Sequence, residues 1–170
     1  KDNDVIVEDV DVKIKEGKIT KIGNNLETEE GEKIIDAKNK VVMPGLINTH
    51  THIAMSIFRG TFEGCSLYTW LNEKIWPIEA KLTKEDVYNA SMLSIAEMIS
   101  TGTTCVNDHY FISNAIRKAA EDSKVRTVLT RVLMDSDGEN GFKQRVKEFE
   151  NLYETRNKEN EFVTIDSEGR

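Results

Sequence analysis

The chain has 170 residues, a length that suits one domain with at most a small appendage. Hydrophobic residues make up 38% of the sequence, enough for a core, and the net charge of −7 disfavours nucleic acids and anionic membranes as partners. No apolar run reaches the roughly 18 residues of a membrane-spanning helix. The first ten residues also lack the apolar core of a signal peptide, so a cytoplasmic location is expected.

The first 40 residues are predicted to be β-structure. Residues 11–23, DVKIKEGKITKIG, alternate apolar and charged side chains on both sides of Glu16 and Gly17, which predicts a hairpin with one solvent-exposed face. Residues 32–40, EKIIDAKNK, predict a further short strand and a polar turn. Because one or two hairpins are not stable alone, we expect this segment to pack on another part of the protein.

From Val41 onward the pattern changes. Residues 41–50, VVMPGLINTH, are almost continuously apolar and predict a strand that is covered on both faces. Residues 67–76, LYTWLNEKIW, predict a helix, and Pro77 is expected to stop it.

Residues 82–102 predict a longer helix with recognisable ends. Thr83 is a good N-cap, and Leu82 and Val87 fit a hydrophobic staple. Gly102 stands where a C-terminal glycine belongs.

The rest of the chain alternates between the two kinds of element. The predicted strands cover residues 103–108, 125–133 and a short piece of 161–170, and the predicted helices cover residues 112–123 and 142–153. Strands that alternate with helices indicate an α/β fold, in which a parallel sheet carries helices on its faces.

Two of the three histidines, His50 and His52, stand at the end of the first strand of this α/β region. Residues i and i+2 of a strand point to the same face, about 6.6 Å apart, so the two imidazoles can reach one metal ion. Regular alternation places Asn48 on that face as well, with Thr49 and Thr51 opposite. The alternative is a pair of ordinary histidines, but two polar rings on a buried face cost a few kcal/mol unless they are satisfied, and a metal satisfies both.

Four stretches together resemble the amidohydrolase superfamily, and within it the chlorohydrolase and aminohydrolase branch. They are MPGLINTHTH, FRG, TWLNEKIWPIEAKLT and STGTTCVND. The resemblance runs from the N-terminal hairpin to about Tyr153. It implies a TIM (β/α)8 barrel with a small β-sandwich built from both ends of the chain. Residues 1–42 would then be an incomplete β-sandwich segment, and residues 43–170 the first three or so β/α units of an incomplete barrel.

The resemblance also assigns site residues. His50 and His52 match the two metal ligands of the first barrel strand. Glu79 matches a carboxylate that binds ribose hydroxyls, and the alternative is a carboxylate favoured by the dipole at a helix start. Arg131 matches a substrate-binding arginine at a strand end, and a plain ion pair is the alternative there.

The sequence departs from the family pattern in two places. Related deaminases often carry a second arginine after DSDGENG, whereas this chain has Phe142 and Lys143, with Arg145 further on, which leaves the substrate open. The third histidine ligand, the further catalytic histidine and the metal-binding aspartate of the family belong to later strands. The acid/base groups are therefore expected outside this chain, and His109 is expected to be a surface or capping residue rather than a ligand.

The resemblance implies a parent protein that is a metal-dependent hydrolytic deaminase of adenosine-like nucleosides, such as 5-methylthioadenosine and S-adenosylhomocysteine. It would hold one Zn²⁺, or Fe²⁺ in its place, per full-length subunit, and it would act on a small molecule. The resemblance is compatible with a homo-oligomer. The 170-residue chain alone is expected to be inactive.

Three alternatives stand beside this interpretation. A sister amidohydrolase could use the same metal site on s-triazines, as a chlorohydrolase, or on guanine. A truncated or degenerate paralogue could bind or assemble without catalysis. An unrelated α/β binding module would require the resemblance to be accidental.

Overall fold

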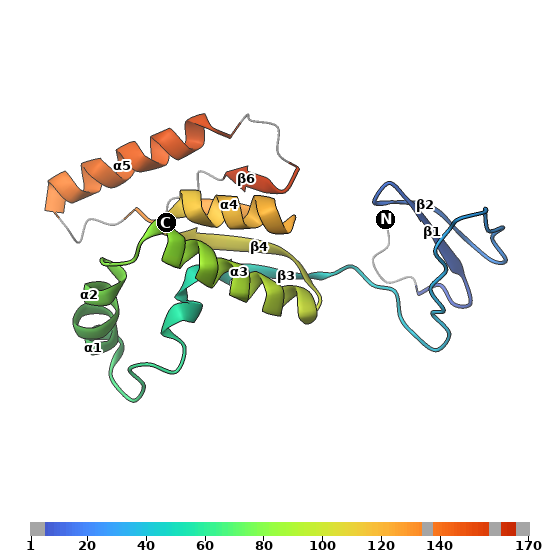
Figure 1. Ribbon diagram of the computed structural model, residues 1–170, viewed down its shortest axis with the longest axis horizontal. Coiled ribbons are helices and arrows are strands. Elements are labelled where there is room, and N and C mark those ends of the chain that lie inside the picture. Colours follow the sequence, from blue (N-terminus) through green and yellow to red (C-terminus); the bar gives the residue numbers. More distant parts are fainter. Residues whose placement is uncertain (1–5, 134–137, 157–160, 166–170) are drawn as a thin grey trace. The chain divides into compact units, whose positions relative to one another are not determined.

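The computed structural model describes residues 6–133, 138–156 and 161–165. The chain divides into two compact units, Lys1–Val42 and Met43–Arg170, and Figure 1 labels the elements of each. None of the helices in the described part of the chain combines the length and the hydrophobicity needed to cross a membrane.

The first unit contains the predicted hairpin. Strands β1 (Asp11–Lys15) and β2 (Lys18–Gly23) pair in antiparallel fashion. Glu16 and Gly17 between them have φ values of 51° and 71°, as a two-residue turn with both central residues in the left-handed region requires.

The short strand predicted within residues 32–40 is wrong, whereas the polar turn predicted there forms, with the Lys40 N–H donating to the Ala37 carbonyl oxygen over 2.9 Å. No strand forms there in the described chain, and Ile34 and Ile35 are 73% and 74% exposed. A strand needs a neighbour to satisfy its backbone groups, and within the described residues the sheet of this unit contains only β1 and β2.

The second unit is built on a four-stranded parallel sheet, which confirms the predicted α/β class. Its strands lie in the order β3 (Leu46–Thr51), β4 (Thr103–Tyr110), β5 (Arg126–Arg131) and β6 (Val163–Ile165). Because neighbouring strands run in the same direction, their carboxyl ends meet at one edge of the sheet.

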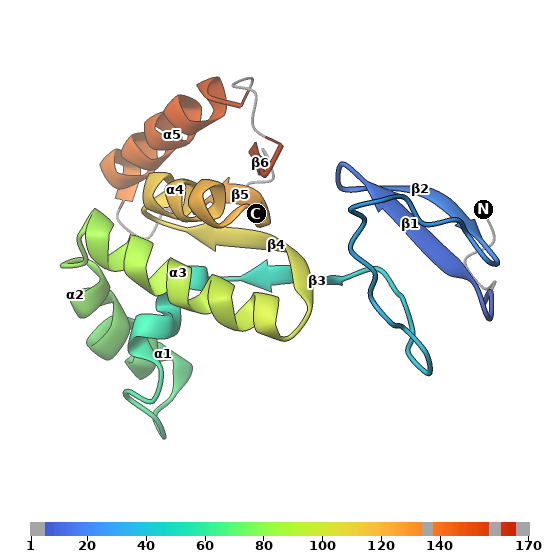
Figure 2. The same cartoon turned by 45° about the vertical axis from the view of Figure 1, so that its right-hand side comes forward.

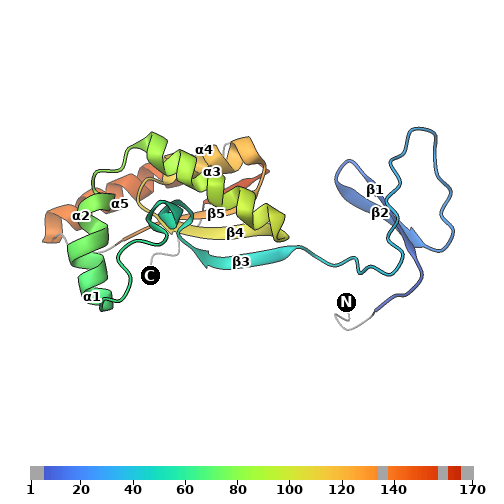
Figure 3. The ribbon, with the colours of Figure 1, turned by 60° about the horizontal axis from the view of Figure 1, so that its bottom comes forward.

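The two central helices, α3 (Lys84–Ser100) and α4 (Ser113–Ser123), cover one face of this sheet (Figure 3). A third long helix, α5 (Gly138–Glu154), follows β5 in the chain. The core between sheet and helices includes Val87, Ile95, Val106, Ile116 and Leu129.

Helix α3 has the ends that the sequence predicts. Thr83 caps it, and the side chains of Thr83 and Asp86 bond each other's backbone N–H groups in a capping box. Gly102 follows the C-cap with φ of +88°.

The connection between β3 and α3 contains four short helical pieces. They are the 3₁₀-helix η1 (Ile53–Phe58), α1 (Leu67–Thr69), the π-helix η2 (Trp70–Ile75) and α2 (Trp76–Glu79). Pro77 does not stop the helix as predicted, because it lies in the first turn of α2, where its missing N–H is not needed. As a result the helix continues to Glu79, and Figure 2 shows α1 and α2 beyond the carboxyl end of β3.

Strand β3 is not covered on both faces, contrary to the prediction. Leu46 and Ile47 are 52% and 66% exposed. In the described sheet β3 is an outer strand, and α3 and α4 lie over one face of the sheet (Figure 3). An apolar run indicates which side chains are suited to burial. Whether they are buried depends on the segments that pack against the strand.

The start of β3 requires a glycine at position 45. A Cβ added to Gly45 would lie 2.2 Å from Cγ2 and 2.3 Å from Oγ1 of Thr104 on β4. We expect Gly45→Ala to destabilise the second unit by about 1–3 kcal/mol, because the strands must separate to admit the methyl group. Urea unfolding measures the change. Gly23→Ala is the control, since its Cβ would meet nothing closer than 3.5 Å, and equal unfolding midpoints for the two variants would contradict the prediction.

Candidate functional site

Three imidazole rings gather at the carboxyl edge of the sheet. His50 and His52 come from the end of β3, and their ring centroids lie 5.1 Å apart with the rings nearly perpendicular. The ring of His109 on β4 lies 5.9 Å from that of His52. The structure therefore brings together all three histidines of the chain.

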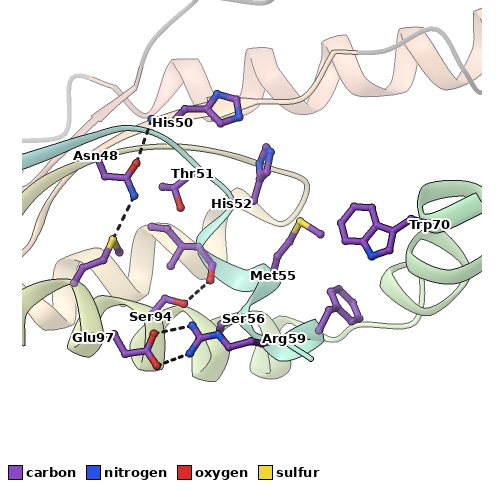
Figure 4. A pocket seen from close by; sticks show the side chains of 13 residues that line it. Asn48, His50, Thr51, His52, Met55, Ser56, Arg59, Trp70, Ser94 and Glu97 are labelled. Carbon is purple, nitrogen blue, oxygen red and sulfur yellow. Dashed lines mark hydrogen bonds and ion pairs between the residues drawn. The ribbon is translucent and has the colours of Figure 1, made fainter. Parts of the chain in front are cut away.

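The rings of His50, in β3, and His52, directly after it, lie next to each other, whereas Asn48 lies on the face of β3 towards α3. The register between β3 and β4 shifts between Asn48 and Thr51, so the regular alternation is interrupted there. Asn48 pairs with the buried Val106 and its amide contacts Met98 Sδ of α3 at 3.8 Å. Figure 4 shows Asn48 Oδ1 accepting from the backbone N–H of His50, over 3.3 Å. The prediction for Asn48 was wrong because strict alternation does not survive a bulge.

The end of β4 holds the chain where it leaves β3. His52 Nδ1 lies 2.5 Å from the carbonyl oxygen of His109, and the Ile53 N–H donates to Asp108 Oδ1 over 2.6 Å. A carbonyl oxygen only accepts, so Nδ1 of His52 carries the proton and Nε2 keeps its lone pair. This hydrogen bond sets the tautomer that a metal-binding histidine needs.

His109 lies within β4, which extends two residues beyond the predicted strand of residues 103–108. Strand β4 continues to Tyr110 because His109 and Tyr110 pair with Thr130 and Arg131 of β5. Burial lowers the pKa of the His109 imidazole, and the neighbouring His52, His50 and Arg131 lower it further. The ring is therefore held neutral near the other two histidines.

The histidine pair could hold part of a metal site. Two imidazoles on one face, one with a fixed tautomer, fit a divalent transition metal or zinc ion, which accepts neutral nitrogen ligands. Within residues 6–133, 138–156 and 161–165 no group of three His, Cys, Asp or Glu side chains is placed to hold a metal ion. The pair would supply two ligands, whereas a catalytic zinc site typically needs three from the protein.

Glu79 lies half-buried at the end of α2, near the histidines. Burial raises the pKa of its carboxyl group, while a hydrogen bond from Tyr110 and the proximity of His52 oppose the shift. The Tyr110 hydroxyl donates to Glu79 Oε1 over 2.6 Å. A residue of β4 therefore fixes the Glu79 side chain.

Arg131 is buried at the end of β5, 8% exposed, and it forms an ion pair with Glu148 of α5. Its guanidinium also lies 5.5 Å from the ring centroid of Phe111, and Arg145 of α5 lies 5.2 Å from the same ring. The structure thus has the ion pair that was the alternative for Arg131. It also brings Arg145 beside Arg131, which the linear spacing did not reveal.

An open hollow of about 570 Å³ borders the histidines on the side of η1 and α3 (Figure 4). Its lining includes His50, His52, Met55, Trp70 and Glu97. Glu79 and Arg131 are not among its lining residues.

Tyr110, a further residue at this edge, escaped the sequence analysis, and Asp108 was expected to be structural. Both follow the period-two pattern of β4, in which Val106, Asp108 and Tyr110 are buried and the residues between them are partly exposed. The alternation of residues 103–110 in the sequence could have indicated them, because a polar group on the buried face of a strand requires a hydrogen-bond partner.

Residues 41–170 match the Amidohydrolase family. The chain belongs to the amidohydrolase family. Among its relatives are a 5-methylthioadenosine/S-adenosylhomocysteine deaminase from Carboxydothermus hydrogenoformans, 49% identical over 135 residues, and a 5'-deoxyadenosine deaminase from Methanosphaera stadtmanae, 46% identical over 134 residues. The matches cover 78% and 79% of this chain but 31% and 32% of those proteins, so the chain spans about a third of their length.

Solved amidohydrolase structures share the arrangement of elements. An adenosine deaminase from Xanthomonas campestris with bound zinc superposes with a TM-score of 0.75 at 26% identity, covering 95% of this chain and 38% of that one. A guanine deaminase from C. acetobutylicum superposes with a TM-score of 0.78 at 22% identity. The match covers 95% of this chain and 41% of the guanine deaminase chain. The second likeness supports the fold alone.

In this amidohydrolase chain, Asp108 is fully buried and its Oδ2 has no hydrogen-bond partner among the described residues. Burial raises the pKa of Asp108 to about 7 from an ordinary value of 3.8, against the opposing hydrogen bond from Ile53. Between these values the unfolded chain loses its proton while the folded chain keeps it. The folded state therefore binds more protons, and its stability falls as the pH rises from about 4 to about 7.

We expect Asp108→Asn to flatten this fall, since asparagine keeps an oxygen for the Ile53 N–H and does not titrate. Urea unfolding at a series of pH values between 4 and 8 measures the slope. Asp122→Asn is the control, because the hydrogen bond from Lys118 lowers the pKa of that exposed carboxyl group and gives the opposite sign. An unchanged slope in Asp108→Asn would show that Asp108 does not carry the effect.

Proposed function

We propose that this chain forms part of a metal-dependent hydrolytic deaminase of adenosine-like nucleosides, and that it supplies two metal ligands and a substrate-binding carboxylate. The observation that carries the proposal is the convergence of His50 and His52 at the carboxyl edge of a parallel sheet, within electrostatic reach of Glu79. This edge is where active sites lie in (β/α) barrels. Relatives that share 40–50% of the sequence and are named as adenosine-type deaminases support the substrate class.

The complete protein is proposed to close the sheet into a (β/α)8 barrel, with residues 1–42 contributing to a β-sandwich. The zinc-bound adenosine deaminase of similar fold supports zinc as the metal, and iron stays the alternative. His50 and His52 would hold the ion, with His52 presenting Nε2. The chemistry that a bound ion supplies is a hydrolytic nucleophile at neutral pH, because it lowers the pKa of a coordinated water towards about 7.

Three other residues of this chain, Glu79, Arg131 and Arg145, bind and orient the substrate. Glu79 accepts hydrogen bonds from the ribose hydroxyls, since an ionised carboxylate is an acceptor only. Arg131 and Arg145 both lie against the ring of Phe111, and guanidinium groups at this position favour a substrate with an anionic substituent. S-adenosylhomocysteine carries a carboxylate that 5-methylthioadenosine and 5'-deoxyadenosine lack. The groups that transfer protons to the leaving ammonia are expected outside this chain.

A substrate panel tests the proposed function. The full-length protein, loaded with zinc, is assayed for ammonia release from S-adenosylhomocysteine, 5-methylthioadenosine, 5'-deoxyadenosine and guanine, and for chloride release from a chlorinated s-triazine. We expect the adenosine-like nucleosides to be preferred. Turnover of guanine or the triazine alone would establish a sister activity, and no turnover would favour a non-catalytic paralogue.

Metal content tests the two histidine ligands. We expect His50→Ala and His52→Ala each to reduce bound zinc in the full-length protein by about tenfold or more after desalting, because each removes one of few ligands. Elemental analysis gives the ratio of zinc to protein. His109→Gln is the control and is expected to keep the metal, so a loss of zinc in that variant would instead make His109 a ligand.

Glu79→Ala tests ribose recognition. We expect the KM for an adenosine-like nucleoside to rise by about 10- to 100-fold, the range for losing hydrogen bonds to a charged group, with adenine itself affected by less than about twofold. Steady-state kinetics on the two substrates measure the difference. Glu85→Ala, which removes an exposed carboxylate from α3, is the control. Equal effects on nucleoside and base would rule out ribose recognition by Glu79.

A further inference from the structure

Tyr110 connects the two residues that are predicted to bind the substrate. Its hydroxyl donates to Glu79 Oε1 over 2.6 Å, and its backbone carbonyl accepts from Arg131 Nη1 over 3.5 Å. The tyrosine is the last residue of β4, so it is held by the sheet, whereas Glu79 ends the short helix α2. A residue of the rigid sheet thus reaches a residue of a connecting segment.

The ring of Tyr110 is buried in the core at 3% exposure, while its hydroxyl reaches out of the core. A buried tyrosine usually finds a hydrogen-bond partner, and here the partner is a carboxylate. Within the described part of the chain, no lysine, arginine or histidine forms an ion pair with Glu79, and Tyr110 provides the one side-chain hydrogen bond found for it. The orientation of the Glu79 side chain therefore depends on this hydroxyl.

We propose that Tyr110 is a positioning residue, whose hydroxyl holds Glu79 Oε1 so that Oε2 faces the ribose hydroxyls of the substrate. The inference rests on the proposed function, because it assumes that Glu79 accepts from those hydroxyls. A carboxylate held at one oxygen has lost the rotation that would otherwise be lost on binding, so its second oxygen binds more tightly. Tyr110 acts through Glu79 and does not itself touch the substrate.

Tyr110→Phe in the full-length enzyme tests the proposal, because phenylalanine keeps the ring in the core and removes only the hydroxyl. We expect the KM for an adenosine-like ribonucleoside to rise about tenfold, with kcat changed by less than about twofold. The KM for the 2',3'-dideoxy analogue should not change. In the Glu79→Ala background Tyr110→Phe should add nothing, because the two residues act as one unit.

Tyr88→Phe is the matched control. Tyr88 also donates to a carboxylate, Asp122, over 2.8 Å, but this pair lies on the exposed side of α3 and α4. The Tyr88→Phe substitution removes the same hydroxyl group from the same kind of hydrogen bond. We expect KM and kcat to stay unchanged for both the ribonucleoside and its 2',3'-dideoxy analogue.

The outcomes separate this inference from the proposed function. An unaltered protein that deaminates adenosine-like nucleosides, together with an unchanged KM in Tyr110→Phe, would overturn the positioning role alone. An equal rise in KM for the dideoxy analogue would show a general defect and would overturn it as well. If the unaltered protein deaminates none of these nucleosides, both proposals fail.

A second variant covers the case in which Tyr110→Phe does not fold. Glu79→Asp keeps the charge but shortens the side chain by one methylene, so the carboxylate no longer reaches the Tyr110 hydroxyl. We expect the KM for the ribonucleoside to rise as far as it does in Glu79→Ala. A KM within about twofold of the unaltered enzyme would show that the bond to Tyr110 is dispensable.

Discussion

The parallel pairing of β3 with β4 is the constraint on which the site depends. The pairing places the end of β4 beside the residues that follow β3. Two hydrogen bonds join them: the His52 ring donates to the His109 carbonyl oxygen, and the Ile53 N–H donates to Asp108. The first selects the tautomer of His52, and the second fixes the backbone that follows it. Without these contacts the H-x-H spacing would still exist, but the His52 ring would lack the hydrogen bond that orients it.

The same strand also organises the substrate side of the edge. Tyr110 lies two residues beyond Asp108 on the buried face of β4, and it contacts Glu79 from the β3–α3 connection and Arg131 from β5. Parallel strands place their ends at one edge, so residues from three separate parts of the chain meet there. The core and the candidate site are therefore continuous, and a change in one is transmitted to the other.

Burial governs the charges at this edge. Asp108 is fully buried and accepts from the Ile53 N–H, and the carboxyl group of Glu79 is half-buried and accepts from the Tyr110 hydroxyl. In both cases removal from water raises the pKa. Buried carboxyl groups with raised pKa values lower the stability of the folded protein at neutral pH. Groups of this kind cluster at sites of binding or catalysis. The amidohydrolase membership of the chain agrees with that interpretation.

The sequence by itself determined the alternation of strands and helices, the cap of α3 at Thr83, the hairpin turn at Glu16 and Gly17, and the histidine pair. These features depend on local geometry, which short stretches specify through side-chain periodicity and preferred φ values. Only the tertiary structure decided the rest. The bulge after Asn48, the continuation of the helix through Pro77, the exposure of Ile47 and the bond from Tyr110 to Glu79 each depend on which segments become neighbours. Contacts between residues far apart in the chain leave no periodic trace in it, because each partner is placed by a different element.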